Sequence, residues 1–408
     1  MPGLLAENAK VILALTAAFP SDGDQVREML LSAEEYGALA EDLRAQGAKP
    51  ADLLKAGAAE VIDACSGTVE EGRLKKLLAR ASRAQSAARD WEASGIWFLT
   101  RADKRYPKLL REHLCEDTPP VIWGMGSLAI AEEGGIAIAG KSDSDPLAEE
   151  QGLKHGELAA FSGLTVFATG KSGAEAAALR SALKKKGVVC QVPSKPIDAF
   201  VGNDAWKKLI AGKRLTLVTA YAPGTPAAAI SDMAVEKLSM ALADCAILMN
   251  ADLQTDSVWQ AAEELLGKYE SIRLAYWSSG APTPGTEELI DMGMQPMPEF
   301  GGVVDFHNFV KGKPEAPKEV PIHQPGEFEE VPPDPSTKPK ITEDADAASV
   351  NPEVAQGLEE LKAKVKDLLA IDGMTGAAVL QTVASELIAT GKIDPIIATI
   401  VAKVGHAG

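Results

Sequence analysis

Three segments decide the fold of this chain: GIAIAGKSDSD at residues 135–145, LTVFATGKSGAE at 164–175 and GVVCQVPSKPID at 187–198. Each begins with an apolar run typical of a buried β-strand, over 135–139, 164–168 and 187–192. Each run is followed by a loop that contains one lysine: Lys141, Lys171 or Lys195. Because ligands bind outside the carboxyl ends of the strands in a parallel α/β sheet, we expect the three lysines to converge there and bind a phosphate-bearing anion.

Further apolar runs follow at 214–220, 245–249 and 272–276, with amphipathic helical segments between them. Strands that alternate with helices predict a parallel sheet with right-handed crossovers. The predicted fold class is therefore α/β, with a Rossmann-like, doubly wound, mostly parallel sheet over residues 95–310.

Residues 1–94 have apolar positions at helical spacing and no convincing strand, which predicts an N-terminal helical domain. Ser32 followed by Glu35 is typical of a capping box. One long helix is predicted over 71–91. Its basic side chains either touch nucleic acid or, as we favour, form an ordinary solvated face: Arg73, Lys75, Lys76, Arg80, Arg83 and Arg89.

The composition changes at Lys311. Residues 311–352 are rich in proline and acidic residues, which predicts a disordered linker. Helical periodicity returns in residues 353–408 and predicts a small C-terminal helical module.

The chain has 408 residues and a formal net charge of −17, which argues against a protein that coats nucleic acid over its whole surface. A small basic pocket remains compatible with that charge. The four cysteines form no CxxC pair and the five histidines have no metal-ligand spacing, so we expect neither a metal nor a cofactor. No apolar run approaches the roughly 18–20 residues of a membrane span, and we expect a cytoplasmic protein.

Gly135, Gly140, Lys141 and Ser142 match the pattern GxxxxGK[ST] of phosphate-binding loops. In a true loop of that type the four intervening residues form the loop, whereas here they are Ile-Ala-Ile-Ala and favour a strand. We therefore do not expect a P-loop NTPase. Gly140 and Gly170 still lie where the backbone must turn, so each either exposes N–H groups to an anion or forms a plain tight turn.

Nothing in the sequence indicates catalysis, since there is no nucleophile elbow and no Ser/His/Asp set. Glu175 falls in the first turn of a predicted helix, where a carboxylate interacts favourably with the helix dipole. We expect a structural role for it and no enzymatic activity for the chain.

The middle region resembles the DNA-processing protein A family (DprA/Smf), a Rossmann-like group involved in natural transformation. Six segments carry the resemblance in collinear order: FLTRADKRYPKLLREH (98–113), TPPVIWGMGS (118–127), IAIAGKSDSD (136–145), GKSGAEAAALRSAL (170–183), YAPGTP (221–226) and GTEELIDMGM (285–294). The second segment, residues 118–127, is similar to a strand of the family. The chain departs from the family at ligand-binding positions, with Lys141 for an arginine, Glu175 for an aspartate, Leu179 for a histidine and Asn250 for an acid. Residues 235–237 replace an Arg-Asn-Arg run.

Typical members of the family bind single-stranded DNA, dimerise and help to load the RecA recombinase, with no established catalytic cycle. Members often carry a small C-terminal winged-helix domain, so the resemblance suggests a winged-helix-like fold for residues 353–408. The resemblance implies a divergent, non-enzymatic mediator of DNA recombination or uptake, with single-stranded DNA, a RecA-type recombinase and a second copy of the chain as partners. The residues expected to bind nucleic acid or phosphate are Gly140, Lys141, Ser142, Gly170, Lys171, Ser172, Gly173 and Lys195.

Two other functions remain open. The same Rossmann-like pocket is suited to a nucleotide, which would make the chain a sensor or a nucleotide-processing protein; its net acidity and the missing arginines favour that alternative. In the second alternative the pocket is vestigial and the terminal helical modules bind protein partners.

Overall fold

The computed structural model describes residues 5–312 apart from positions 21, 141–145, 172, 252–255, 270, 279 and 281. The chain divides into two compact units, Met1–Pro321 and Ile322–Gly408, and all the structure described below belongs to the first unit. The predicted linker, except for its first two residues, and the predicted C-terminal module lie outside the described residues.

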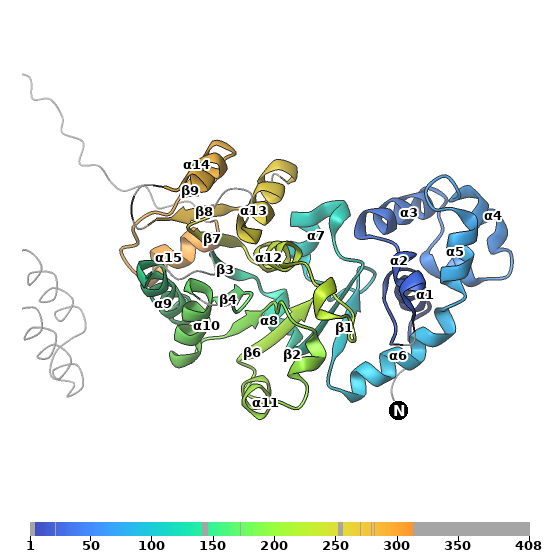
Figure 1. Ribbon diagram of the computed structural model, residues 1–408, viewed down its shortest axis with the longest axis horizontal. Helices are drawn as coiled ribbons and strands as arrows, with labels where there is room; N and C mark the ends of the chain where they lie inside the picture. Colours follow the sequence, from blue (N-terminus) through green and yellow to red (C-terminus); the bar gives the residue numbers. More distant parts are fainter. Residues whose placement is uncertain are drawn as a thin grey trace, which may run out of the picture. The chain divides into compact units, whose positions relative to one another are not determined.

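The N-terminal part is helical, as the sequence predicts (Figure 1). Its helices are α1 (Glu7–Thr16), α2 (Asp24–Glu28), α3 (Ala33–Ala45), η1 (Pro50–Leu54), α4 (Ala58–Ala64), α5 (Glu71–Leu78) and α6 (Ala81–Ala93). Helix α1 is the centre of this part, because every residue from 11 to 15 is buried. The capping box at the start of α3 is confirmed: the Glu35 N–H donates to the Ser32 hydroxyl, and the Ser32 N–H donates to the Glu35 carboxylate.

The prediction of one continuous helix over 71–91 is wrong, because α5 ends at Leu78 and α6 begins at Ala81. The turn between them places Arg80 inside the core, where only 4% of its surface is exposed. Its guanidinium pairs with the buried Asp22 at 2.5 Å and lies 4.5 Å from the centre of the Phe19 ring. Since Arg73 is likewise paired, with Glu35 at 2.6 Å, the predicted basic side chains do not form one solvated face.

Within the described part of the chain, nine strands form a single sheet in the order β1-β2-β6-β5-β4-β3-β7-β8-β9. All the strands predicted from apolar runs are present. The strands are β1 (Trp97–Thr100), β2 (Val121–Gly126), β3 (Gly135–Gly140), β4 (Thr165–Ala168), β5 (Val189–Gln191), β6 (Leu215–Thr219), β7 (Cys245–Met249), β8 (Leu274–Trp277) and β9 (Gln295–Pro296). In the spatial order β6-β5-β4-β3-β7-β8-β9, each strand runs parallel to its neighbours. Strand β2 runs antiparallel to both β1 and β6.

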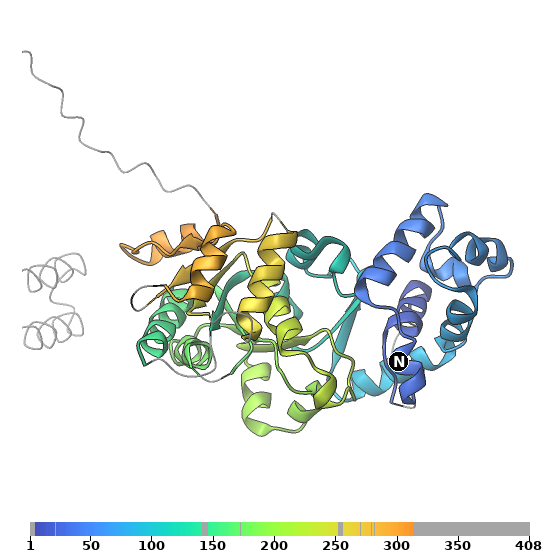
Figure 2. The same ribbon diagram turned by 45° about the horizontal axis from the view of Figure 1, so that its top comes forward.

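Helices cover both faces of the sheet (Figures 1 and 2). They are α7 (Lys108–Leu114), η2 (Cys115–Asp117), α8 (Leu128–Glu132), α9 (Pro146–Phe161), α10 (Ala174–Lys184), η3 (Ile197–Phe200), α11 (Asp204–Ala211), η4 (Ala227–Ala229), α12 (Asp232–Ala241), α13 (Ser257–Lys268), α14 (Pro284–Asp291) and α15 (Val303–Val310). Alternate residues of the strands belong to different cores: Ile136 and Ile138 pack with α9 and α10, and Ala137 and Ala139 pack with α12 and α13. This alternation is what a strand buried on both faces requires.

The order of the strands defines one topological switch point. From β3 the chain builds outward through β4, β5 and β6 in one direction, then returns to pair β7 with the other side of β3 and continues to β8 and β9. In doubly wound sheets ligands bind in the crevice beyond the carboxyl ends of the two strands at such a point. The strands concerned here are β3, which ends at Gly140, and β7, which ends at Met249.

Candidate functional site

The predicted site residues that the structure describes lie at the carboxyl edge of the parallel strands. Gly140 is the last residue of β3, Gly170 and Lys171 follow β4, and Lys195 follows β5 with an exposed side chain. Because these strands are parallel neighbours, their following loops lie at the same edge of the sheet. Lys141, Ser142 and Ser172 lie outside the described residues, so the convergence of the three lysines stays a prediction.

Glu175 connects the ends of β3 and β4. Its side chain is fully buried, and one carboxylate oxygen accepts from the Gly140 N–H at 3.4 Å. The other oxygen accepts from the Thr169 N–H at 3.0 Å and from the Thr169 hydroxyl. Strand ends leave backbone N–H groups without ladder partners, and this carboxylate satisfies two of them. The structure therefore gives Glu175 the structural function expected for it, although through strand ends and not only through a helix dipole.

Lys171 reaches from the loop after β4 to α12, which packs on β3 and β4, and to the start of α13, which packs on α12. Its ammonium lies 2.9 Å from Glu236 Oε1 on α12, 3.0 Å from the Ser257 hydroxyl at the start of α13 and 3.7 Å from Asp232 Oδ2. Only 16% of the lysine side chain is exposed. The cation is therefore held in one place by groups from two other elements.

Glu236 is as deeply buried as Glu175, with no exposed surface. Its Oε1 is within ion-pair distance of Lys171, and its Oε2 has no hydrogen-bond partner among the described residues. A buried carboxylate that lacks partners holds its proton more strongly than an exposed one. Glu236 is thus a titratable group at the candidate site that the sequence analysis did not identify.

Burial shifts the protonation of all three groups. Burial raises the pKa of Glu175 to about 7, against the opposing effects of its hydrogen bonds and of Lys171. Burial, together with repulsion from Glu175, raises the pKa of Glu236 well above its usual range. For Lys171 burial works against the charge, but the carboxylates of Glu236 and Asp232 outweigh it and raise the lysine pKa. The ammonium keeps its proton, and the two carboxyl groups bind an additional proton near neutral pH.

The two glycines of the β4 loop have conformations that other residues adopt rarely. Gly170 has a φ of +82°, and a Cβ there would lie 1.8 Å from the Gln191 amide nitrogen. Gly173, with a φ of +81°, is the residue before α10. Glycine at these two positions lets the chain turn between the strand and the helix next to the buried carboxylates.

Glu236, Ser257 and the more distant Asp232 are the polar neighbours of Lys171 that sequence reasoning did not find. In the sequence, the sign of Glu236 is an acidic residue that stands between Val235 and Leu238, two apolar positions of a predicted helix. In the sequence, residues 235–237 stand out only as a departure from the family pattern.

Among the described residues no group of three or more His, Cys, Asp or Glu side chains is arranged to hold a metal ion. In the same residues no helix is both long and apolar enough to cross a membrane.

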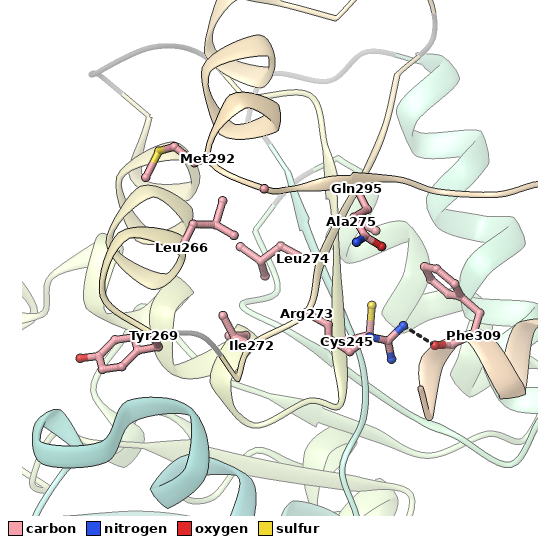
Figure 3. Close-up of a pocket in the computed structure, with 11 residues that line it drawn as sticks. Cys245, Leu266, Tyr269, Ile272, Arg273, Leu274, Ala275, Met292, Gln295 and Phe309 are labelled. Carbon is pink, nitrogen blue, oxygen red and sulfur yellow. Dashed lines mark hydrogen bonds between the residues drawn. The ribbon is translucent and has the colours of Figure 1, made fainter. Parts of the chain in front are cut away.

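A cavity of about 440 Å³ lies at the opposite, amino end of β7 and β8 (Figure 3). Cys245 and Leu274, the first residues of these strands, line it together with Arg273. The Arg273 guanidinium donates to the Phe309 and Val310 carbonyls at the end of α15, so part of its hydrogen-bonding capacity is used within the protein. None of the predicted site residues lines this cavity.

Comparisons with known proteins agree with the fold. A family model described as DNA recombination-mediator protein A matches residues 97–299, which span the sheet from β1 to β9. The X-ray structure of DNA processing protein A from Streptococcus pneumoniae is 16% identical, with a TM-score of 0.52, and the match covers 69% of this chain and 95% of that one. At this identity the likeness shows the fold alone.

A second solved structure concerns the single-stranded DNA binding mode of DNA processing protein A from Helicobacter pylori. It is 21% identical, with a TM-score of 0.40, and the match covers 53% of this chain and 96% of that one. Among proteins with curated descriptions, none matches this chain.

Proposed function

Because this chain belongs, through residues 97–299, to the DNA recombination-mediator protein A family, we propose that it binds single-stranded DNA through phosphate contacts at the carboxyl edge of its sheet. In this proposal it acts as a recombination mediator without a catalytic cycle. A RecA-type recombinase and a second copy of the chain remain its expected partners, as the family resemblance implies.

The observation that supports the proposal most directly is the position of Lys171. The lysine follows β4, the neighbour of the switch-point strand β3, and its ammonium is fixed by Glu236 and Ser257. In α/β sheets phosphate groups bind beyond the carboxyl ends of the strands, where glycine turns and helix N-termini expose backbone N–H groups, and a lysine at that edge adds positive charge. This surface would be extended by the exposed Lys195 on the neighbouring loop and by Lys141 and Ser142, which follow Gly140 in the sequence.

The protonation of the buried carboxyl groups supports an anion site as well. If Glu175 and Glu236 were both ionised, they would outweigh the single charge of Lys171. Their raised pKa values mean that the pair takes up a proton near neutral pH, which removes one negative charge from the surroundings of Lys171, while Asp232 Oδ2, 3.7 Å from the ammonium, is a further acidic neighbour. An incoming phosphate therefore meets less repulsion than the number of acidic residues indicates.

The competing ligand is a mononucleotide in the same crevice. The switch point between β3 and β7 is where doubly wound folds bind nucleotides, so this alternative uses the same strand ends and glycines. A mononucleotide contacts few phosphates, whereas a DNA strand neutralises several lysines along its length. The number of phosphates bound distinguishes the two ligands.

The test compares ligands on the full chain. Titration of a fluorescently labelled 30-nucleotide oligo(dT) at low salt, followed by anisotropy, should give saturable binding, and calorimetry with dTMP or ATP should give much weaker binding. Tight mononucleotide binding without oligonucleotide binding would favour the nucleotide alternative. Binding of neither, together with loss of protein partners after deletion of residues 353–408, would favour the scaffold.

A further inference from the structure

We propose that a second surface of the chain, at the amino edge of β5 and β6, binds single-stranded DNA: its lysines contact phosphates, and an exposed phenylalanine stacks on a base. This amino-edge surface consists of Phe161, Lys184, Lys185, Lys186 and Lys213. It lies at the opposite end of β5 and β6 from the loops that follow these strands. The proposal rests on the proposed function only in the choice of the ligand.

Two short segments of this acidic chain carry only basic charges. Residues 180–187 read RSALKKKG, and residues 207–214 read KKLIAGKR. Each segment contains four basic residues and no acidic one, although the formal net charge of the chain is −17. A patch of one sign raises the local concentration of ligands of the opposite sign. A polyanion is therefore the kind of ligand that these segments attract.

The fold brings the two segments together. The first forms the end of α10 and the turn into β5, and the second forms the end of α11 and the turn into β6. Because β5 and β6 are parallel neighbours, the two turns enter the sheet side by side. The Arg214 guanidinium joins the turns, since it donates to the Leu183 carbonyl and, at 3.3 Å, to the Gly187 carbonyl. The basic side chains of both segments thus belong to one surface.

Three of the lysines are available to a ligand. Lys184, Lys186 and Lys213 are exposed, and among the residues that the structure describes they form no ion pair. Lys185 differs, because its ammonium lies 2.7 Å from the Glu157 carboxylate on α9. Phosphates can therefore approach three cations without displacing an acidic side chain.

The helix ends explain only part of this charge. A lysine in the last turn of a helix is stabilised by the helix dipole, which accounts for Lys184. Lys186 and Lys213 lie beyond their helices with φ values of +64° and +53°, a conformation that glycine adopts at lower cost. The turn itself would be more stable with glycine at both positions, so the lysine side chains indicate a use outside the turn.

Phe161 adds an aromatic ring to the lysines. It is the last residue of α9, its surface is 57% exposed, and the Lys185 ammonium lies 5.5 Å from the centre of its ring. The end of α9 packs against the turn after α10, where a Cβ on Gly187 would lie 2.6 Å from the Ala160 Cβ. Proteins bind single strands by stacking bases on exposed aromatic rings while cations contact the phosphates. This combination favours a single strand, because its bases are free to stack.

An acidic protein is the other kind of partner that a basic surface attracts. Protein interfaces have an apolar core that is rich in aromatic side chains. Within the described residues, Phe161 is the only large apolar side chain of the amino-edge surface that is exposed. One ring among lysines is too little apolar surface for such a core, and it suits a base and its phosphates better.

The test is a salt series with a fluorescently labelled 30-nucleotide oligo(dT) and the full chain, followed by anisotropy. The amino-edge triple variant changes Lys184, Lys186 and Lys213 to alanine. Its slope of log affinity against log salt should be shallower by roughly 2 than that of the wild type, at about 0.7 for each phosphate. Phe161→Leu should weaken binding about fivefold at every salt concentration and keep the wild-type slope, because it removes a base contact and no charge.

Matched controls separate the surface from general effects. Changing the exposed lysines Lys75, Lys108 and Lys154 to alanine alters the net charge equally and should keep the wild-type slope. Leu54→Ala shortens another apolar side chain, 40% exposed, and should bind oligo(dT) like the wild type. Circular dichroism should show that every variant is folded.

A wild-type slope in the amino-edge triple variant, or wild-type affinity in Phe161→Leu, would overturn the proposal. If that slope is unchanged while the same variant loses salt-sensitive self-association in sedimentation, the surface binds an acidic protein surface instead. The variant with Lys141, Lys171 and Lys195 changed to alanine tests the proposed function separately. A shallower slope in that variant alone would reject the amino-edge surface and keep the carboxyl-edge site, and a shallower slope in the amino-edge triple variant alone would do the reverse.

Discussion

The ammonium of Lys171 lies 2.9 Å from Oε1 of Glu236, a carboxylate with no exposed surface. The lysine belongs to the loop after β4 and the glutamate to α12, so the pair joins a strand end to a helix that packs on β3 and β4. A cation fixed in this way is pre-positioned to bind an anion, but the carboxyl group beside it partly neutralises its charge. Mutation of the carboxyl group measures how strongly this neutralisation weakens anion binding.

Replacing Glu236 should strengthen DNA binding. At alkaline pH, where the Glu175–Glu236 pair has lost its shared proton, Glu236→Gln removes negative charge from the buried side of Lys171 and keeps the shape of the side chain, so more of the positive potential of the lysine reaches a phosphate. We expect oligo(dT) to bind more tightly to this variant at every salt concentration, by anisotropy. Glu150→Gln, which removes the partner of Lys154 at 2.9 Å on an exposed helix surface, is the control and should bind like the wild type. Unchanged or weaker binding in Glu236→Gln would argue that Lys171 does not contact the DNA.

Glu175 should make the protein less stable as the pH rises. Its pKa in the folded state is about 7, compared with an ordinary value of 4.5, so the folded chain keeps a proton that the unfolded chain releases between these values. The stability that this proton contributes is fully present below about pH 4.5 and is lost as the pH rises through 7, on the order of 3 kcal/mol in total. Urea unfolding at pH 5 and pH 8 measures it.

The variant Glu175→Gln should lose less free energy of unfolding than the wild type over the same pH interval, whatever its absolute stability. Glu150→Gln, on the exposed side of α9, should keep the wild-type pH dependence. Equal pH dependence in Glu175→Gln and the wild type would contradict the raised pKa.

The buried pair of Arg80 and Asp22 should be essential for the N-terminal helices. Arg80→Ala leaves the buried Asp22 carboxylate with only the partly exposed Arg83, at 3.1 Å, as a cationic partner and removes the donors to the Ala14 and Ala17 carbonyls. Breaking such a pair from one side costs about 3–5 kcal/mol. Chemical denaturation followed by circular dichroism gives the value. Lys75→Ala on the same stretch of chain breaks only an exposed pair with Glu71 and should cost less than about 1 kcal/mol; similar losses in both variants would contradict the structure.

The parallel part of the sheet could be predicted because each strand is buried on both faces. Such strands are continuous apolar runs, and residues 135–140 and 245–249 are visible in the sequence for that reason. The antiparallel direction of β2 had no such signal. Its segment stands out in the sequence only through its similarity to a family strand, and an apolar run does not indicate which neighbour it pairs with or in which direction.

The candidate site was predictable in position but not in chemistry. A glycine and a lysine after a strand indicate the edge of the sheet where Lys171 is found. Its partner Glu236 is far along the chain, on a helix whose inward face is otherwise apolar, and only the packing of α12 brings the two together. The break at Arg80 has the same origin, because the partner that draws it inward, Asp22, belongs to a different part of the chain.

The most direct test of the proposed DNA site is the salt dependence of oligo(dT) binding, measured by anisotropy across a salt series. Each lysine that no longer neutralises a phosphate should reduce the slope of log affinity against log salt by about 0.7. The variant with Lys141, Lys171 and Lys195 all changed to alanine should therefore have a slope shallower by roughly 2 than the wild type, because three phosphates are then left without a cation. The matched control changes Lys75, Lys108 and Lys154, whose side chains are exposed, and should keep the wild-type slope. Equal slopes in the wild type and the first triple variant, or an affinity indifferent to salt, would contradict the account.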